Sequence, residues 1–275
     1  MRTFDIYCDA SVSPSLRGAC GGALTVERNS QNINMQAVIQ PQGTNNSGEI
    51  CALLLGVTSA INIKESTSEP CRFNIFSDSV ISIKGIREWI FGWIANANKN
   101  GNNILINSDG KPVMNQFYFK AIFNQIIIHN LDAHFYHQPG HVVGNYGSST
   151  YAGAAREFQK VNGIPLVRLG LTSETISTFN NFIDGRTRDI LREYLAKGTT
   201  SFEGVSIDMI ANTEYEAVSN TMLIPVIINV MESPLADSEQ YNFAFLNGKN
   251  IIKKYAQLVH ALDYPSKARV IKYLS

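Results

Sequence analysis

The sequence lacks any uninterrupted apolar run of the about 18 residues that a membrane-spanning helix requires. Its first residues, MRTFDIYCDA, also lack the charged and then apolar pattern of a secretory signal. These two absences argue against a membrane protein and against an exported one. We therefore expect a cytoplasmic protein without a membrane partner.

Cysteine is scarce, and charge of either sign is not in excess. The four cysteines show no Cys-x-x-Cys spacing, which argues against a structural zinc site or a disulfide framework and favours reduced thiols. Basic and acidic residues number 23 each, so the formal net charge is zero. This balance argues against a strongly basic nucleic-acid coat protein, whereas a local basic groove is compatible with the composition.

Hydrophobic residues make up 44 % of the 275 positions, enough for one large domain or for a medium one with a substantial appendage. Their periodicity predicts the element order β-β-β-α-β-α-α-β-α. The expected strands are residues 4–9, 18–27, 32–39, 71–78 and 133–138, and the expected helices are residues 47–63, a stretch from 79, 115–130 and 149–161.

Beyond Gly163 the pattern changes to helical segments around one apolar run, TMLIPVIINVM. About 110 residues is a plausible size for a small domain. We therefore expect two domains: residues 1–162, and a smaller, mainly helical C-terminal domain of unknown role at residues 163–275.

Three acidic residues occupy informative places in the first domain. Asp9 is expected to end the first strand, Asp78 to end the fourth, and Glu49 to lie in the first turn of a helix. If the two strands are neighbours, both Asp side chains emerge at one edge of the sheet, and the helix start brings Glu49 to them. Three like charges at such a short distance repel strongly unless a cation lies among them. Carboxylate oxygens suit Mg²⁺ or Mn²⁺.

Each acid taken alone also has a purely structural explanation. A single Asp after a strand is commonly a turn residue. Asp78 would equally serve as the cap of the following helix, and Glu49 would favour a helix N-terminus electrostatically. Taken together, in this order and at these element boundaries, the three acids favour a metal site.

The motifs around these acids resemble those of type 1 ribonuclease H, the enzymes that cut the RNA strand of an RNA–DNA hybrid. The family's first strand carries an Asp, a small residue and a Ser, similar to Asp9-Ala10-Ser11. Its "TNNxxE" helix start resembles "TNNSGE" here, and its "TDS" strand end resembles "SDS" at Asp78.

The resemblance covers residues 3–161 and includes the family's protruding substrate-binding region. There "GIREWIFGWIANANKNG" and "DGKPVMNQFYF" are similar to the tryptophan-containing helix and the Lys-Pro-Val-x-Asn signature. The segment "HFYHQPGHV" resembles the fifth strand and the Gly-His that starts a catalytic loop. The resemblance implies an α/β fold of the ribonuclease H type, a five-stranded mixed sheet flanked by helices.

The same resemblance implies an activity. It predicts a Mg²⁺-dependent endoribonuclease that cleaves the RNA strand of RNA–DNA hybrids by a two-metal mechanism. Asp9, Glu49 and Asp78 would hold the metals, for which Mn²⁺ is an alternative. His141 would act in proton transfer or product release, to which its near-neutral pKa is suited.

Five further residues are candidates for substrate binding. Three amide side chains could hydrogen-bond minor-groove atoms, including the 2′-hydroxyl that distinguishes RNA. Trp93 could stack on sugars of the DNA strand or belong to the core, and Lys111 is one of few basic residues in the protruding region. The three amides are Asn45, Asn46 and Asn115, of which the first two have turn and capping chemistry as the alternative.

The chain departs from the family at one acid. The family places a fourth carboxylate at the start of its last helix, about ten residues after the Gly-His, where this chain has Tyr151. Either Glu157 replaces that acid, with a helix that starts later, or the ligand is missing. We expect the second metal to bind weakly, so that activity requires more Mg²⁺ or prefers Mn²⁺.

Because this fourth acid is missing, we retain a second functional hypothesis. A catalytically weak or inactive ribonuclease H-like scaffold would serve as a binding module for nucleic acid or for a protein. The intact Asp9, Glu49 and Asp78 oppose that interpretation, while the added residues 163–275, through which the chain could also self-associate or recruit a protein partner, favour it.

Overall fold

The computed structural model describes residues 1–198, except Pro14, Leu16, Arg17, Gln31, Pro41 and residues 100–103 and 144–148. A five-stranded sheet with the strand order β3-β2-β1-β4-β5 forms its centre. Its strands are β1 (Arg2–Ser13), β2 (Gly18–Glu27), β3 (Ile33–Gln40), β4 (Cys71–Ser77) and β5 (Ala133–His137). β1 and β3 run antiparallel to β2, whereas β4 runs parallel to β1 and β5. The predicted mixed sheet is confirmed, with its first and fourth strands adjacent.

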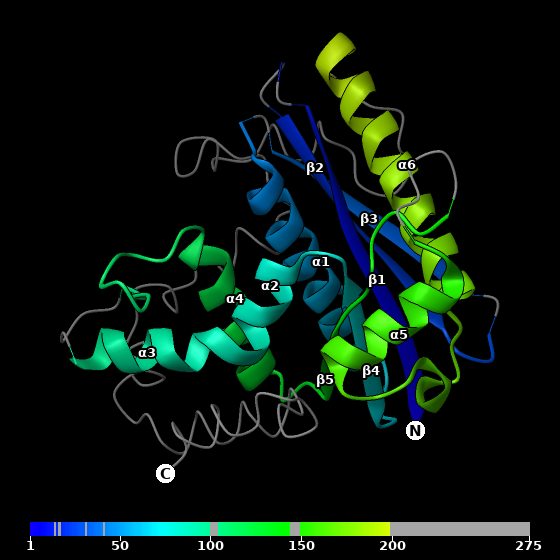
Figure 1. Cartoon of the computed structure of the whole chain (residues 1–275), viewed down its shortest axis with the longest axis horizontal. Coiled ribbons are helices and arrows are strands. Elements are labelled where there is room, and N and C mark those ends of the chain that lie inside the picture. Colours follow the sequence, from blue (N-terminus) through cyan, green and yellow to red (C-terminus); the bar gives the residue numbers. More distant parts are fainter. Residues whose placement is uncertain are drawn as a thin grey trace.

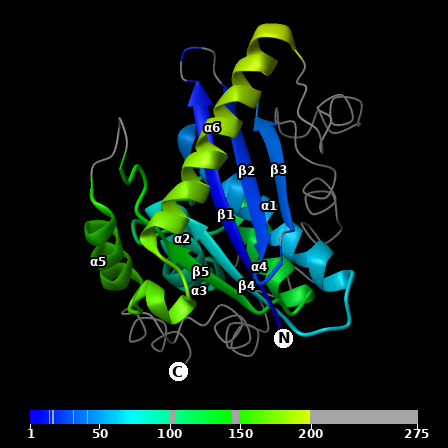
Figure 2. The same ribbon diagram turned by 90° about the vertical axis from the view of Figure 1, so that its right-hand side faces the viewer.

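Helices cover both faces of this sheet (Figures 1 and 2). One face carries α1 (Asn45–Glu65), α2 (Val80–Lys84), the π-helical turn η1 (Gly85–Trp89), α3 (Ile90–Lys99) and α4 (Gln116–Ile128). The other carries α5 (Tyr151–Asn162), the 3₁₀ turn η2 (Leu166–Leu169) and α6 (Ser173–Lys197). Successive residues of β1 point to opposite faces of the sheet and pack into two separate hydrophobic cores. Ile6 and Cys8 pack with α1, while Tyr7 packs with α5 and α6.

α1 lies unusually close to the sheet because small residues face each other. A Cβ atom built on Gly21 of β2 would lie 3.0 Å from the Gly48 carbonyl oxygen of α1. The small residues of β2 therefore allow the backbone of α1 to pack directly against this strand. By length and composition α1 would also be able to cross a membrane, but 78 % of its apolar window is buried inside the fold, as in a core helix.

α6 packs along the opposite face, over β1 and β2 (Figure 2). Its apolar residues Ile176 and Ile183 share a hydrophobic cluster with Tyr7 and Leu24 of the strands, and Ile190 shares another with Cys20. α6, one of the helical segments expected beyond Gly163, is thus part of the same packed body as the sheet. The domain boundary after residue 162 stays a prediction, and residues 199–275 of the predicted C-terminal domain lie outside the described residues.

Two element predictions need correction. β1 does not end at Asp9 but continues to Ser13, because β2 goes on pairing with it after β4 has ended. The helical stretch from residue 79 is not one regular helix, since η1 interrupts it. A Cβ atom on Gly85 at the start of η1 would lie 2.3 Å from the Phe119 ring, so the local backbone is placed where only glycine fits.

Candidate active site

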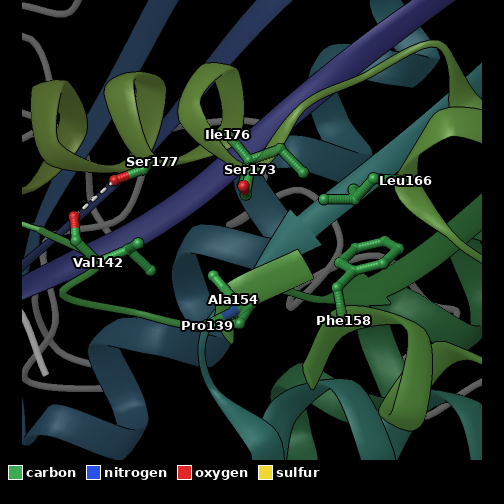
Figure 3. A pocket seen from close by; sticks show the side chains of 8 residues that line it. All are labelled: Pro139, Val142, Ala154, Phe158, Leu166, Ser173, Ile176 and Ser177. Atoms are coloured by element: carbon green, nitrogen blue, oxygen red, sulfur yellow. Dashed lines mark hydrogen bonds between the residues drawn. The ribbon is translucent and has the colours of Figure 1, made fainter. Parts of the chain in front are cut away.

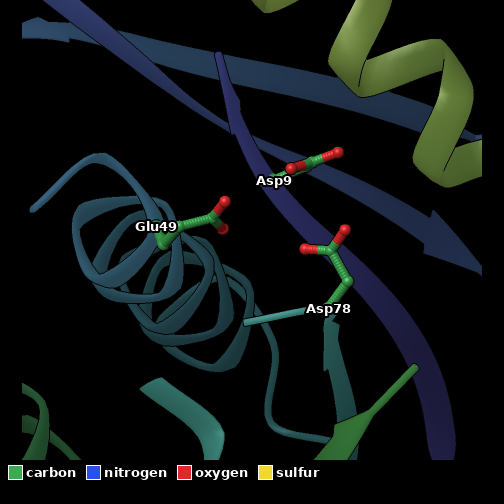
Figure 4. A group of neighbouring side chains, drawn as sticks. All are labelled: Asp9, Glu49 and Asp78. Atoms are coloured by element: carbon green, nitrogen blue, oxygen red, sulfur yellow. The ribbon is translucent and has the colours of Figure 1, made fainter. Parts of the chain in front are cut away.

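Three carboxylates meet where the parallel strands β1 and β4 part (Figure 4). The last paired residues of these strands are Cys8 and Ser77, and the next residue in each strand direction is an aspartate, Asp9 or Asp78. α1 brings Glu49 to them. One carboxylate oxygen from each residue lies within 4.8 Å of the corresponding oxygens of the other two. From the sequence, the acids were expected to meet only if the two strands were neighbours. β1 and β4 are indeed adjacent, and the acids do meet.

The capping alternatives for these acids do not hold. Thr44, not Glu49, caps α1, with Ser47 completing a capping box. Glu49 is the fifth residue of the helix, and α1 has no acidic residue in its first turn. Ser79, not Asp78, caps α2 by accepting a hydrogen bond from the Ser82 amide. Both acids are therefore free of the helix-end roles that would have explained them.

Burial and mutual repulsion favour the protonated form of all three acids. Asp9 and Glu49 are 5 % and 7 % exposed, and Asp78 is partly buried. Burial and the charge of Asp78 raise the pKa of Glu49 to about 9. Burial, Asp78 and Glu49 raise the pKa of Asp9, and burial raises that of Asp78 although the positive charge of His141 opposes the shift. A cation would replace the protons that these groups otherwise hold.

The donor set fits a hard divalent cation. All three groups offer carboxylate oxygens, the ligands that Mg²⁺ and Mn²⁺ favour. Glu49 Oε2 is buried without a hydrogen-bond partner, which is costly in a folded protein unless something binds there. Asp9 keeps one internal bond, in which its Oδ1 accepts from the Ala10 amide at 2.7 Å.

The segment Pro139-Gly140-His141 closes one side of the site. A Cβ atom on Gly140 would lie 2.2 Å from Asp78 Oδ2, so only glycine allows the backbone to pass so close to this carboxylate. His141 follows with a left-handed φ of 50° and an exposed side chain near Asp78. Sequence reasoning singled out His141 but missed the steric role of Gly140.

The predicted substrate-binding residues lie in two places. Asn45 and Asn46 are exposed in the first turn of α1, the same end of the helix that presents Glu49. The remaining three belong to the side of the molecule formed by α3 and α4 (Figure 1). Their roles stay predictions.

Each of those three has a distinct local setting. Trp93 is partly buried and packs edge-on against Phe119, with the ring centroids 5.0 Å apart. Lys111 is exposed, in a loop held by the Asn107 side chain. Asn115 precedes α4 with a left-handed φ of 55° and makes no capping bond through its side chain. The core interpretation of Trp93 thus has direct support, although part of the ring is accessible.

Glu157 is not brought into the acidic group. α5 begins at Tyr151 behind its cap Thr150, so the helix does not start later, as a replacement by Glu157 would require. Glu157 is exposed on α5, well past the first turn. Within the described residues, the start of α5 offers no acid to the site.

An acid that the sequence argument did not consider lies nearby. Asp184 of α6 raises the pKa of Asp9, Glu49 and Asp78 alike through its charge. Its own carboxylate and backbone carbonyl each accept from Ser11 Oγ at 3.1 Å. Asp184 is half-buried and lies at helical spacing from the buried Ser177 and Asn180, but this spacing does not indicate which surface the helix covers.

That same face of α6 holds the segment around His141. Ser177 Oγ donates to the Val142 carbonyl at 2.9 Å (Figure 3), and Gln138 donates to the side chain of Asn180. Figure 3 shows a small pocket where this segment meets α5 and α6, lined by Pro139 and Ile176 among others. α6 therefore supports the edge of the site from outside the five-stranded core.

The sheet order, the strand directions and the carboxylates at the parting of β1 and β4 define a ribonuclease H-like nuclease fold. A sequence model of the RNase H family matches residues 1–156, more than half of the chain. The chain belongs to the ribonuclease H family and is a ribonuclease H-type hydrolase.

Curated relatives agree with this assignment. The chain is 27 % identical over 132 residues to ribonuclease H of Novosphingobium aromaticivorans, covering 48 % of this chain and 81 % of that one. It is 33 % identical over 131 residues to the Haemophilus influenzae enzyme, covering 48 % and 75 %. Against ribonuclease H of Legionella pneumophila it is 30 % identical over 95 residues, covering 34 % of this chain and 57 % of the relative.

Solved structures of related proteins are more distant. The crystal structure of LC9-RNase H1, a type 1 RNase H with the type 2 active-site motif, is 15 % identical with a TM-score of 0.41, covering 82 % of this chain and 87 % of that one. The solution structure of the PFV RNase H domain is 18 % identical with a TM-score of 0.39, covering 58 % and 90 %. With TM-scores below 0.5, neither adds to the family assignment.

Proposed function

We propose that this chain cleaves the RNA strand of RNA–DNA hybrids in a reaction that depends on Mg²⁺ or Mn²⁺. The observation that carries the proposal is the group formed by Asp9, Glu49 and Asp78, whose oxygens lie within 4.8 Å of one another. No ion pair joins any of the three to a basic side chain in the described part of the chain. Such a group is stable at neutral pH when divalent cations are bound among its members.

The cations would supply an activated water and stabilise the leaving oxygen in a two-metal mechanism. The chain's own residues would hold and shape this site. Asp9, Glu49 and Asp78 would together hold the cations through their carboxylate oxygens. Gly140 keeps its backbone close to Asp78 and thereby fixes the position of that carboxylate.

His141 would move protons or help product leave. It stands exposed beside Asp78, where a substrate phosphate would have to approach. A near-neutral pKa suits an imidazole to both tasks. Asn45 and Asn46, exposed at the same end of α1 as Glu49, would contact the minor groove of the hybrid and its 2′-hydroxyl groups.

The nucleic acid would extend from the carboxylates towards α3 and α4. Lys111 would contact the phosphate backbone, Asn115 the minor groove, and the accessible part of Trp93 a sugar of the DNA strand. The relatives named ribonuclease H support the choice of substrate, and the exposed positions of Lys111 and Asn45 are compatible with it. The proposed cellular location is the cytoplasm.

The proposal is tested by a cleavage assay on three labelled substrates: an RNA–DNA hybrid, duplex DNA and duplex RNA. Each is incubated with the full chain in Mg²⁺, in Mn²⁺ and in a chelator. We expect cleavage of the RNA strand of the hybrid alone, and only with a divalent cation. Cleavage of duplex RNA at the same rate, or cleavage that persists in the chelator, would contradict the proposal.

One observation supports a second candidate function. The start of α5 carries Thr150 and Tyr151 where the family has an acid. A chain that lacks a complete ligand set would bind hybrid without cutting it. In that case the same assay would give no product at any Mn²⁺ concentration, while binding of the labelled hybrid would persist.

A further inference from the structure

α6 is anchored directly beside Asp9. Asp9 and Ser11 are two residues apart in β1, so their side chains leave the same face of the sheet. Ser11 Oγ donates to Asp184 Oδ1 at 3.1 Å, and Thr187 Oγ1 donates to Ser11 Oγ at 3.0 Å. Gly22, which pairs with Asp9 across the sheet, would place a Cβ atom 2.6 Å from Thr187 Cγ2. The segment of α6 around Asp184 therefore packs on the strand pair that carries Asp9.

The Asp9 carboxylate faces this helix. In Figure 4 the side chain of Asp9 extends away from α1 and towards the yellow-green ribbon of α6. On the opposite side, Glu49 Oε2 is buried and has no hydrogen-bond partner. An unpartnered carboxylate oxygen in a residue that is only 7 % exposed indicates that a ligand belongs between α1 and the strand ends.

We propose that Asp184 is the fourth acid of this site and takes the place of the carboxylate absent from the start of α5. It would help hold a second divalent cation together with Asp9, from a helix that lies outside the residues matched by the family. This inference rests on the proposed function, because it assigns a ligand within the same metal site.

The present partners of Asp184 would permit this role. Its Oδ2 lies 3.5 Å from Arg188 Nη2, and the two side chains are 32 % and 44 % exposed. An ion pair one helical turn apart at such exposure is weak, so a cation could displace Arg188 at little cost.

The competing explanation is that Asp184 only fastens α6 to β1. Asp184→Asn distinguishes a metal ligand from a residue that only fastens the helix. The amide oxygen of Asn still accepts a hydrogen bond from Ser11, while the negative charge is lost. Ser11→Ala does the reverse, since it removes the fastening bond and keeps the charge. Asp189→Asn is the matched control, because Asp189 is exposed on the same helix, and Glu157→Gln tests the other candidate acid.

The experiment measures Mn²⁺ binding to the metal-free full chain by electron paramagnetic resonance, with unfolding temperature as a check on folding. We expect Asp184→Asn to weaken the lower-affinity Mn²⁺ site by at least the about 10-fold that loss of an outer-shell partner costs, because Asp184 is proposed to hold the cation directly. Asp189→Asn and Glu157→Gln should leave Mn²⁺ affinity at the wild-type value. Ser11→Ala should lower it less than Asp184→Asn does, because it removes only an outer-shell bond to Asp184 and keeps the carboxylate.

Equal Mn²⁺ binding by wild type and Asp184→Asn would overturn the inference, and so would an equal loss in Ser11→Ala. Failure of wild type to bind Mn²⁺ would overturn the inference and the metal site together. Hybrid cleavage measured on the same samples separates this inference from the proposed function. A silent Asp184→Asn in an active enzyme refutes only the role of Asp184, and Mn²⁺ binding without hybrid cleavage refutes only the activity.

Discussion

The region matched by the family and the helix α6 contribute to one site in different ways. Residues 1–156 bring three acids together through strand adjacency and a helix start, and each acid stands in a short motif. α6, by contrast, carries no motif, and it reaches the site by packing a polar stripe over β1. In residues 1–156 the positions of the acids follow from the order of the local strands and helix. α6, in contrast, comes near the site only because it packs on β1 and β2.

The largest expected effect tests the first region. Asp9→Asn should lower hybrid cleavage by more than about 100-fold, because losing a direct metal ligand should exceed the 10- to 100-fold cost of losing an outer-shell partner. Hybrid binding should remain nearly intact, since the shape of the side chain is kept. Cleavage and binding of a labelled hybrid measure both quantities.

Asp189→Asn provides the comparison from α6, where an exposed acid undergoes the same change. Its cleavage rate should equal that of wild type. Undiminished cleavage by Asp9→Asn, or an equal loss in both variants, would show that the three-acid site is not where the chemistry occurs.

A second effect concerns stability in the absence of metal. The pKa of Glu49 is raised from 4.5 to about 9 in the folded chain, so the folded state binds more protons than the unfolded state between these values. The free energy of unfolding should therefore fall as the pH rises from about 4.5 to about 9. Adding Mg²⁺ should restore stability most at high pH, because the cation replaces the lost protons.

Glu49→Gln tests the cause of that pH dependence. The neutral amide cannot lose a proton, so urea unfolding in a chelator should show a flatter pH profile and a higher stability than wild type at pH 8. Glu157→Gln, an exposed change on α5, should leave the wild-type profile unaltered. If Glu49→Gln destabilises the chain equally at pH 5 and pH 8, the acids do not repel one another as described.

The smallest effect tests the supporting role of α6. Ser177→Ala removes the bond to the Val142 carbonyl and should lower the free energy of unfolding by about 1 kcal/mol. Cleavage should fall by much less than in Asp9→Asn, because only the position of the segment after His141 is loosened. Thr178→Ala, exposed one residue further along α6, is the control. A loss of cleavage as large as that of Asp9→Asn would mean that the bond from Ser177 to Val142 does more than position this segment.

Much of the fold could be predicted from the sequence, because apolar periodicity located the five strands, and the placement of Asp9 and Asp78 favoured adjacency of the first and fourth strands. The continuation of β1 to Ser13 was not predictable in this way. Ala10 and Ser11 resemble loop residues, and it is pairing with β2 alone that keeps them extended. The interruption of the helix at η1 was also not predictable, because the tight packing of Gly85 against the distant Phe119 ring becomes visible only in the folded chain.

The candidate site was predictable to the same degree. Asp9, Glu49 and Asp78 could be chosen because their positions depend on local elements. Asp184 could not, because the spacing within α6 defines a buried face but does not say which surface that face covers. Only the packing of α6 on β1 and β2 shows that Asp184 meets Ser11 two residues from Asp9.

The central claim is that the three carboxylates form one cation site, and anomalous diffraction from crystals soaked in Mn²⁺ tests it most directly. The account predicts an anomalous peak bounded by Asp9, Glu49 and Asp78, at about 2 Å from their oxygens. The same peak should be absent from crystals of the Asp9→Asn variant. No peak among these residues at saturating Mn²⁺, or peaks only elsewhere on the chain, would contradict the account.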